Sequence, residues 1–365
     1  MVKKVTSHSG ACSKERRKAI RKKLGTLKNL TVQEKTKERY SASLAAFFRY
    51  LREEHLELPT KKDCMDALVS DYLEYLWAQG EGRATASTFM AAVQDFQPKL
   101  RHNLLGSWRL MKTWAVHEVP ARAPPMTEAV LRAMVGWAVT QGHETFGLSL
   151  LLGLYALLRT GELLSIQAWQ IHVDSPNQPA VLNLGLTKSG KRQGAAESVT
   201  LTEKHVIQHL RAWKSRVPEH TFLTLKPHTW RNLFSECVQK LKLDRWEFRP
   251  YSLRRGGATH LFVKGGSLDK VIIAGRWTAL KTARIYINSG LAMLTEIQIP
   301  KTLLTPFHRI FDKWNSEPSL EQVLSKNRSG GRGKERKARK KYFTSCDPHH
   351  DIFTFSEWQI FWHSI

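Results

Sequence analysis

The segment EVPARAPPM, residues 118–126, limits more strongly than any other stretch how this chain of 365 residues can fold. It contains three prolines and little apolar periodicity, so a regular helix cannot run through it. The chain is long enough for two or three domains with cores of their own. We therefore predict a folded domain on each side of a linker at residues 118–126.

The part before the linker is predicted to be entirely helical. Residues 31–34, TVQE, have the pattern of an N-terminal capping box, and apolar residues then follow at helical spacing: Tyr40, Leu44, Phe47 and Leu51. A second helix is expected to begin at Asp63 and to end at Gly80. Two more helices are expected near residues 85–96 and 101–117. Residues 31–117 should therefore form a small domain of about four helices.

The part after the linker is predicted to be mainly helical with a small β-sheet. Helical patterns lie at residues 127–141, 144–158, 203–214, 229–242 and 252 to about 287. Residues 181–201 instead alternate apolar and polar side chains, turn through KSGK, and return with the same alternation. This pattern predicts a β-hairpin inside a second domain that spans residues 127–295.

Positive charge is concentrated in two segments near the ends of the sequence. The formal net charge is +25, and residues 1–30 and 326–341 together carry 17 of these charges. An excess of this size favours a polyanionic partner, nucleic acid before a membrane surface. Because such segments have too few apolar residues to build a core, we expect a basic arm without regular structure at residues 1–30 and a basic low-complexity tail at residues 326–365. Basic arms can contact phosphates or serve as a nuclear address.

Several classes of protein are disfavoured by what the sequence lacks. The four cysteines are scattered without metal-ligand spacing: Cys12, Cys64, Cys237 and Cys346. The GxxxxGK[ST], HExxH and GxSxG patterns are absent, which argues against nucleotide hydrolases, zinc proteases and serine hydrolases. We therefore expect no metal and no nucleotide cofactor. The longest apolar run, residues 146–158, is too short to cross a bilayer, and no signal peptide is found, so we expect an intracellular protein without a membrane partner.

Four short segments of the second domain carry candidate site residues. In LYALLRTGELLSI, Arg159 precedes Glu162 by three residues, a spacing that also suits an ordinary ion pair. The hairpin turn carries Lys188 and Lys191, although lysines in turns are usually only solvated.

The other two segments are RPYSLRRGGATH and GRWTALKTARIYINSG. The first contains Arg254, together with Arg255, which we expect to bind phosphate or to support the fold. The second places Trp277 and Tyr286 beside positive charge.

The order and spacing of these segments resemble the tyrosine recombinase, or phage integrase, family. LLRTGEL matches the first box of the family through Arg159 and Glu162, and TKSGK lies where the family places a catalytic lysine on a β-hairpin. YSLR matches the second box, His-x-x-Arg, through Arg254. GRW supplies Trp277 at a position that holds His or Trp, as in the Cre recombinase. The nucleophilic tyrosine then follows at the family spacing, which is Tyr286.

The resemblance covers roughly residues 127–290 and implies a two-domain architecture. A helical DNA-clamping domain would precede a mixed α/β catalytic domain. The implied function is that of a site-specific recombinase or integrase of a mobile element, which cleaves and rejoins double-stranded DNA through a covalent 3′-phosphotyrosyl intermediate. No cofactor is implied. In a eukaryotic host the protein would act in the nucleus.

The chemistry implied by the resemblance assigns a role to each residue type. Tyr286 would attack a DNA phosphate. Arg159 and Arg254 would bind the nonbridging oxygens bidentately, and the indole N–H of Trp277 would donate to another oxygen. Glu162 would orient and pair with an arginine.

A lysine would protonate the departing 5′ oxygen. Lys188 is preferred as this general acid because it directly ends the predicted strand, whereas Lys191 lies across the turn; the choice between them stays open.

Tyr251 departs from the family pattern because it occupies the usual histidine position of the second box. A phenol can donate a hydrogen bond but, with a reference pKa near 10, is a poor base at neutral pH. The alternative hypothesis is therefore a catalytically weakened or silent DNA-binding derivative of the family. A basic nucleic-acid packaging protein is a third interpretation, but packaging would need only the basic tails.

The sequence after Tyr286 is more apolar than an exposed tail should be. It can fold back onto its own domain, or it can dock on a neighbouring subunit, as it often does in the family. We predict a docking segment at residues 296–325. On this basis the protein would be a monomer in free solution and a homotetramer on two DNA sites.

Overall fold

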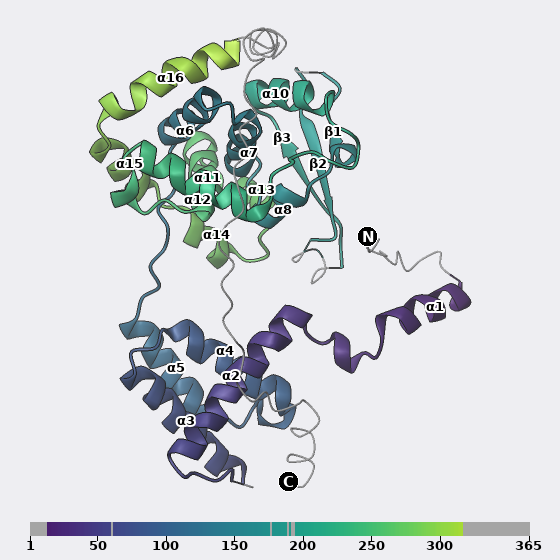
Figure 1. The fold of residues 1–365 in the computed structure, drawn as a ribbon, viewed down its shortest axis with the longest axis vertical. Coiled ribbons are helices and arrows are strands. Elements are labelled where there is room, and N and C mark those ends of the chain that lie inside the picture. Colours follow the sequence, from purple (N-terminus) through teal and green to yellow (C-terminus); the bar gives the residue numbers. More distant parts are fainter. Residues whose placement is uncertain (1–12, 60, 176, 188–189, 191–193, 317–365) are drawn as a thin grey trace, which may run out of the picture. The chain divides into compact units, whose positions relative to one another are not determined.

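The computed structural model describes residues 13–59, 61–175, 177–187, 190 and 194–316. They form two compact units, and the chain passes from the first to the second between Ala121 and Arg122 (Figure 1). The described residues are mostly helical and contain one small antiparallel sheet. The predicted fold class, mainly α with a small β-sheet, is therefore confirmed.

The first unit consists of helices. They are α1 (Lys14–Leu24), α2 (Glu34–Glu53), α3 (Lys62–Ala78), α4 (Arg83–Phe96) and α5 (Leu105–His117), with the short 3₁₀ turns η1 (Lys28–Leu30) and η2 (Pro98–Leu100). Helices α2 to α5 are the four predicted from apolar spacing, and Gly80 follows α3 with a φ of 73°. The predicted capping box is wrong, because α2 begins at Glu34 and its N-cap residue, Gln33, makes no side-chain capping bond.

Helix α1 corrects the expectation that residues 1–30 lack regular structure. Its first turn is capped by Ser13, whose side chain accepts a hydrogen bond from the backbone N–H of Arg16 at 3.2 Å, and Gly25 ends it with a φ of 86°. Lysine, arginine, alanine and leucine are all good helix formers, and an N-cap serine satisfies an otherwise unpaired N–H. No residue of α1 is buried, so capping and intrinsic propensity explain this helix without a core. Residues 1–12 lie outside the described part of the chain.

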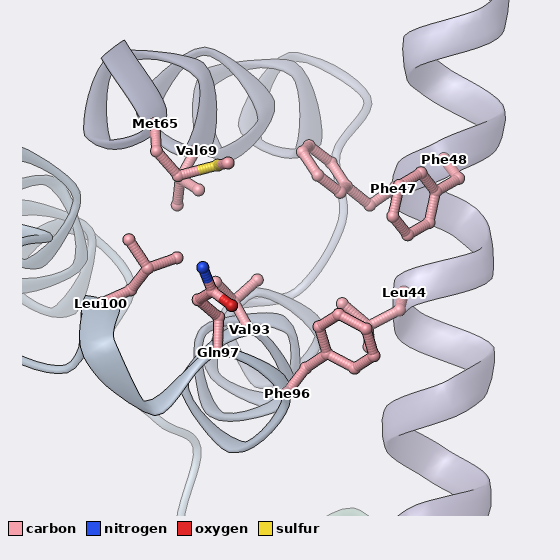
Figure 2. A pocket seen from close by; sticks show the side chains of 9 residues that line it. All are labelled: Leu44, Phe47, Phe48, Met65, Val69, Val93, Phe96, Gln97 and Leu100. Atoms are coloured by element: carbon pink, nitrogen blue, oxygen red, sulfur yellow. The ribbon is translucent and has the colours of Figure 1, made fainter. Parts of the chain in front are cut away.

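The core of the first unit is rich in aromatic rings. Phe47 packs against Phe89 and Tyr72 with ring centroids 4.9 and 5.0 Å apart. Beside this cluster is a cavity of about 20 Å³ between α2, α3, α4 and η2, which Figure 2 shows. Its walls are almost wholly apolar: Leu44, Phe47, Phe48, Met65, Val69, Val93, Phe96, Gln97 and Leu100. A space of one water's size with such walls is a packing gap and not a substrate site.

The second unit surrounds its core with helices and carries the sheet on one side. The helices are α6 (Glu128–Thr140), α7 (Glu144–Tyr155), α8 (Thr160–Ser165), α10 (Lys204–Lys214), α11 (Pro227–Lys240), α12 (Pro250–Gly265), α13 (Leu268–Gly275), α14 (Leu280–Tyr286), α15 (Ser289–Gln298) and α16 (Lys301–Ser316). The single helical pattern predicted from residue 252 to 287 is divided into α12, α13 and α14. The divisions fall at Gly266 and Arg276, which both adopt left-handed backbone conformations.

The sheet contains the predicted hairpin. Strand β2 (Ala180–Gly185) pairs antiparallel with β3 (Glu197–Leu201), and Leu182 lies opposite Val199. A strand of two residues, β1 (Ile171–His172), pairs with the other edge of β2 and was not predicted, because two residues carry no periodic signal. The inward-facing residues of β2 and β3 join the core of the helices.

Helix α16 corrects the prediction that residues 296–325 dock on another subunit. It lies along α6 of its own chain (Figure 1), and its residues Leu304, Phe311 and Trp314 are buried in the unit's core. The contact is close at Gly136, where an added Cβ would lie 2.0 Å from the carbonyl oxygen of Phe307. The apolar spacing of Lys301–Ser316 therefore serves the chain's own core, and residues 317–325 lie outside the described part of the chain.

Candidate active site

The first candidate residues lie where helix α7 ends and α8 begins. Leu157 has a positive φ of 48°, which turns the chain so that Arg159 becomes the N-cap residue of α8. The carboxylate of Glu162 accepts the backbone N–H of Arg159 at 3.0 Å and its Nη1 at 2.5 Å. Burial alone would raise the pKa of Glu162, but Arg276 and Arg159 hold this pKa below its ordinary value. Glu162 is therefore an anion that holds Arg159 in place.

Arg254 lies on α12 and is almost completely buried, with 1% of its surface exposed. Its two terminal nitrogens donate to the carbonyl oxygens of Leu157 and Gly275, so the guanidinium bridges the end of α7 and the end of α13. Its Nε has no partner among the described residues. Burial, reinforced by the charges of Arg159 and Arg276, lowers the pKa of Arg254 to about 9. The side chain remains a cation at neutral pH and is well placed to receive an anion.

Two glycines in RRGGATH allow α12 to come this close to its neighbours. An added Cβ at Gly256 would lie 2.0 Å from the carbonyl oxygen of Met126, and one at Gly257 would lie 1.9 Å from that of Leu154. Any larger residue would push α12 away from the backbone that Arg254 contacts. The glycine pair therefore sets the depth at which Arg254 is buried.

Tyr286 is the last residue of α14 and lies against three of the predicted site residues. Its hydroxyl group is hydrogen-bonded to that of Tyr251 on α12. Its ring centroid is 4.4 Å from that of Trp277, and the guanidinium carbon of Arg254 is 5.7 Å from the Tyr286 ring and 4.9 Å from the Trp277 ring. The buried indole N–H of Trp277 has no partner within the described part of the chain. An unpaired buried donor beside cations is suited to an anionic oxygen.

Tyr251 is exposed over 46% of its surface, and burial of the remainder raises the pKa of its phenol, although Arg254 and Arg159 oppose the effect. The raised pKa makes deprotonation of Tyr251 at neutral pH even less favourable than deprotonation of free tyrosine. Its hydroxyl can still donate a hydrogen bond.

The two lysine candidates, Lys188 and Lys191, lie outside the described residues. Their neighbours in sequence are described: Thr187 donates its hydroxyl to Glu197 Oε2 at 2.6 Å and accepts the N–H of Gly190 at 3.1 Å.

Sequence reasoning missed two residues that the fold adds to this cluster, Arg276 and Glu197. Arg276 Nη2 donates to Glu162 Oε2 at 2.8 Å, and its Nε lies 3.8 Å from Glu197 Oε2. Both side chains are buried. The position of Arg276 between Gly275 and Trp277 was the available signal, but nothing in the sequence shows that it faces carboxylates 79 and 114 residues earlier.

Arg255, next to Arg254, is used differently. It donates to the carbonyl oxygen of Ala123 and, at 3.2 Å, to that of Ile285. Arg255 thus holds the start of the second unit and helix α14 against α12. Supporting the fold is one of the two roles expected for this residue.

The charges of the cluster do not cancel. Three guanidinium groups, of Arg159, Arg254 and Arg276, face two carboxylates, of Glu162 and Glu197. The surplus of one positive charge suits one phosphodiester anion. Among the described residues no group of three or more His, Cys, Asp or Glu side chains is arranged to hold a metal ion, and no helix in that part of the chain is both long and apolar enough to cross a membrane.

Comparison with solved structures identifies the fold. An integrase of the transposon Tn1549, in complex with transposon right end DNA, superposes with a TM-score of 0.50 at 15% sequence identity and covers 73% of this chain and 94% of its own. A lambda integrase dimer bound to a COC′ core site superposes with a TM-score of 0.52 at 14% identity and covers 75% of this chain and 94% of its own. Neither family models nor the curated proteins give a match to the sequence. The chain therefore has the two-domain fold of these integrases, and the resemblance inferred from its sequence is confirmed at the level of the fold.

Proposed function

We propose that this protein is a site-specific DNA recombinase or integrase of the tyrosine recombinase family. The observation that carries the proposal is the meeting of Tyr286 with Arg254 and Trp277 beside the Arg159–Glu162 pair. The fold shared with two integrases bound to DNA supports it, as does the net charge of +25. The partner is double-stranded DNA.

The proposed reaction begins with attack by the Tyr286 oxygen on a DNA phosphorus atom, and the phenolic proton of Tyr286 is lost to water. A new phosphorus–oxygen bond forms to the tyrosine, the bond to the 5′ oxygen breaks, and the 3′ phosphate stays on the protein. Because the phosphodiester energy is kept in this link, rejoining needs no nucleotide. A free 5′ hydroxyl of another strand then reverses the step and releases Tyr286.

The cationic residues would stabilise the extra negative charge on the pentavalent phosphorus. Arg159 and Arg254 offer planar pairs of donors for the nonbridging oxygens, and the indole N–H of Trp277 offers one more. Glu162 keeps Arg159 in place. Lys188, in preference to Lys191, would give its proton to the leaving 5′ oxygen.

Assembly is proposed through the part of the apolar sequence after Tyr286 that stays exposed. Since α16 is part of its own core, the exposed apolar residues of α15, Met293, Leu294 and Ile297, are the better candidates for contact with a second copy. The protein would be a monomer in solution and a homotetramer on two DNA sites, with the first unit helping to clamp the duplex. A mobile-element origin and, in a eukaryotic host, a nuclear location stay predictions.

The test is covalent trapping on DNA. Purified protein is incubated with nicked duplexes made from the DNA that flanks its gene, and a protein–DNA adduct that survives denaturation but not protease is expected. Tyr286→Phe removes only the hydroxyl, so it should abolish the adduct while noncovalent binding stays nearly unchanged. An adduct that persists in Tyr286→Phe would refute the assignment of the nucleophile.

The same assay separates the alternative function. Tyr251 at the usual histidine position, bonded to the Tyr286 hydroxyl, favours a weakened or silent derivative. DNA binding by the unmodified protein without any adduct would support that derivative.

A further inference from the structure

A continuous run of polar contacts joins the β-hairpin to the start of helix α8. Thr187 donates to Glu197 Oε2 at 2.6 Å, and Arg276 Nε lies 3.8 Å from the same oxygen. Arg276 Nη2 donates to Glu162 Oε2 at 2.8 Å, and Glu162 accepts from Arg159 at 2.5 Å. Arg276 is therefore the link between the carboxylate on β3 and the carboxylate on α8.

The linking side chains are shielded from water. Arg276 has 6% of its side chain exposed, Glu197 has 7% and Glu162 has 12%. A buried ion pair that loses one partner leaves an uncompensated charge, so Glu197 depends on Arg276, whereas Glu162 also keeps its pairing with Arg159. Arg276 is held by its backbone as well: it ends α13 with a φ of 55°, and the next N–H, of Trp277, donates to the Ile272 carbonyl at 3.1 Å.

The contacts of Arg276 distinguish it from the arginines that would bind phosphate. Its Nη2 also donates to the carbonyl oxygen of Leu157, which Arg254 contacts too. Two carboxylates compensate the charge of Arg276, so this side chain holds protein groups, although its buried Nη1 has no hydrogen-bond partner among the described residues. Thr187, which contacts Glu197, directly precedes Lys188 in the sequence.

We infer that Arg276 is a positioning residue that locks the β2–β3 hairpin to the Arg159 end of α8. This fixes Thr187 and Glu197 of the hairpin relative to Arg159. The inference rests on the proposed function for its catalytic consequence. The physical link between Glu197 and Glu162 does not depend on that function.

Hydrogen–deuterium exchange of the free protein tests the link without any activity. Arg276→Gln should speed exchange in peptides that cover β2 and β3, while peptides of α6 and α7 stay protected. Arg245→Gln is the control, because Arg245 donates to the Gln298 carbonyl at 3.0 Å outside the network. Unchanged exchange in the hairpin of Arg276→Gln would overturn the inference. If this variant does not fold, Arg276→Lys, which keeps the charge, should show a smaller increase in the same peptides.

The second test asks whether loss of Arg276 impairs the step that needs the general acid. In DNA with a sulfur atom at the bridging 5′ position, Tyr286 forms the same bond to phosphorus, and the sulfur leaves as a thiolate that needs no proton. Arg276→Gln should cleave ordinary DNA roughly 10²-fold more slowly than the unmodified protein and cleave the sulfur substrate at nearly its rate. Arg254→Lys should be slow on both substrates.

The outcomes are distinct. Equal slowing of Arg276→Gln on both substrates would show that Arg276 does not serve the general acid, and would overturn that part of the inference. If the unmodified protein cleaves neither substrate, the proposed function fails, and the exchange experiment still decides whether Arg276 holds the hairpin.

Discussion

The hydroxyl groups of Tyr251 and Tyr286 are hydrogen-bonded to each other, although they belong to helices α12 and α14 and are 35 residues apart. The proposed nucleophile thus contacts the residue that replaces the expected histidine. A phenol whose pKa is raised by burial cannot readily take the Tyr286 proton at neutral pH. It can orient the Tyr286 hydroxyl and donate to a phosphate oxygen.

This contact predicts the effect of substitutions at Tyr251. Tyr251→Phe removes the hydroxyl and should slow adduct formation, whereas Tyr251→His should keep or raise the rate because imidazole titrates near neutral pH. A loss of about 10²-fold is expected for Tyr251→Phe if the hydroxyl donates in the transition state. Single-turnover cleavage of a nicked substrate measures both rates. Equal rates in all three proteins would show that Tyr251 takes no part in the chemistry.

Arg254→Lys should lose cleavage while keeping most of the DNA affinity. The planar guanidinium of Arg254 has donors for the Leu157 and Gly275 carbonyls and for a phosphate at the same time. A lysine keeps the charge, but its single ammonium group cannot make all of these contacts. We expect cleavage to fall about 10²- to 10³-fold, the usual cost of losing a donor to a developing anion. DNA affinity should change little because other phosphate contacts dominate it. The control is Arg245→Lys, and cleavage at the unmodified rate in Arg254→Lys would contradict the prediction.

Gly136→Ala should destabilise the second unit. Alanine favours a helix over glycine, but its Cβ would lie 2.0 Å from the Phe307 carbonyl oxygen and would force α16 away from α6. Overpacking of this kind costs roughly 1–3 kcal/mol in the free energy of unfolding. Urea denaturation measures the change. Gly161→Ala is the control, because among the described residues no atom outside its own helix backbone and its chain neighbours lies within 4 Å of the added methyl group. Equal stability of the two variants would show that α16 is not packed as described.

His209 should make the second unit sensitive to mild acid. Its ring stacks on Trp314 of α16 with centroids 3.5 Å apart, and burial lowers its pKa from 6.5 to about 4, despite a hydrogen bond with Asn315. Because the folded-state pKa lies below the unfolded value, the stability that neutral His209 contributes is fully present above pH 6.5 and is lost as the pH falls towards about 4. The loss should reach about 3 kcal/mol.

Urea denaturation at neutral pH and at about pH 4.5 tests this, with His209→Gln as the variant that no longer titrates. The difference in stability between the two pH values should be smaller in His209→Gln than in the unmodified protein. The exposed His172 provides the control substitution, His172→Gln. An unchanged pH dependence in His209→Gln would contradict the prediction.

Deletion of residues 1–30 should weaken binding to any DNA and flatten its salt dependence. The deletion removes ten lysines and arginines and one glutamate. For every DNA phosphate that this segment neutralises, its removal should lower the slope of log K against log salt concentration by about 0.9. Deletion of residues 1–12 removes only two lysines. The difference between the two deletions therefore gives the contribution of residues 13–30, which include helix α1, to DNA binding. An unchanged slope after the longer deletion would show that this segment does not contact DNA.

The sequence alone was sufficient for the fold class, the hairpin and the identity of most candidate residues. Four helices of the first unit were visible because their apolar residues recur at helical spacing, and the hairpin was visible because β2 and β3 alternate. Arg159, Arg254, Trp277 and Tyr286 were proposed from their order along the chain. Local periodicity and motif order are properties of neighbouring residues, so they can be read without coordinates.

The tertiary structure alone decided which distant groups meet. It buried α16 against α6, so that an apolar stretch expected to bind another subunit became core. It brought Arg276 to Glu162 and Glu197, and it brought the Tyr251 hydroxyl to that of Tyr286. An amphipathic helix has the same sequence pattern whether its apolar face meets its own chain or another. An arginine likewise has no sequence signature for the carboxylate it will pair with, because that choice depends on the packing of helices that are far apart in the chain.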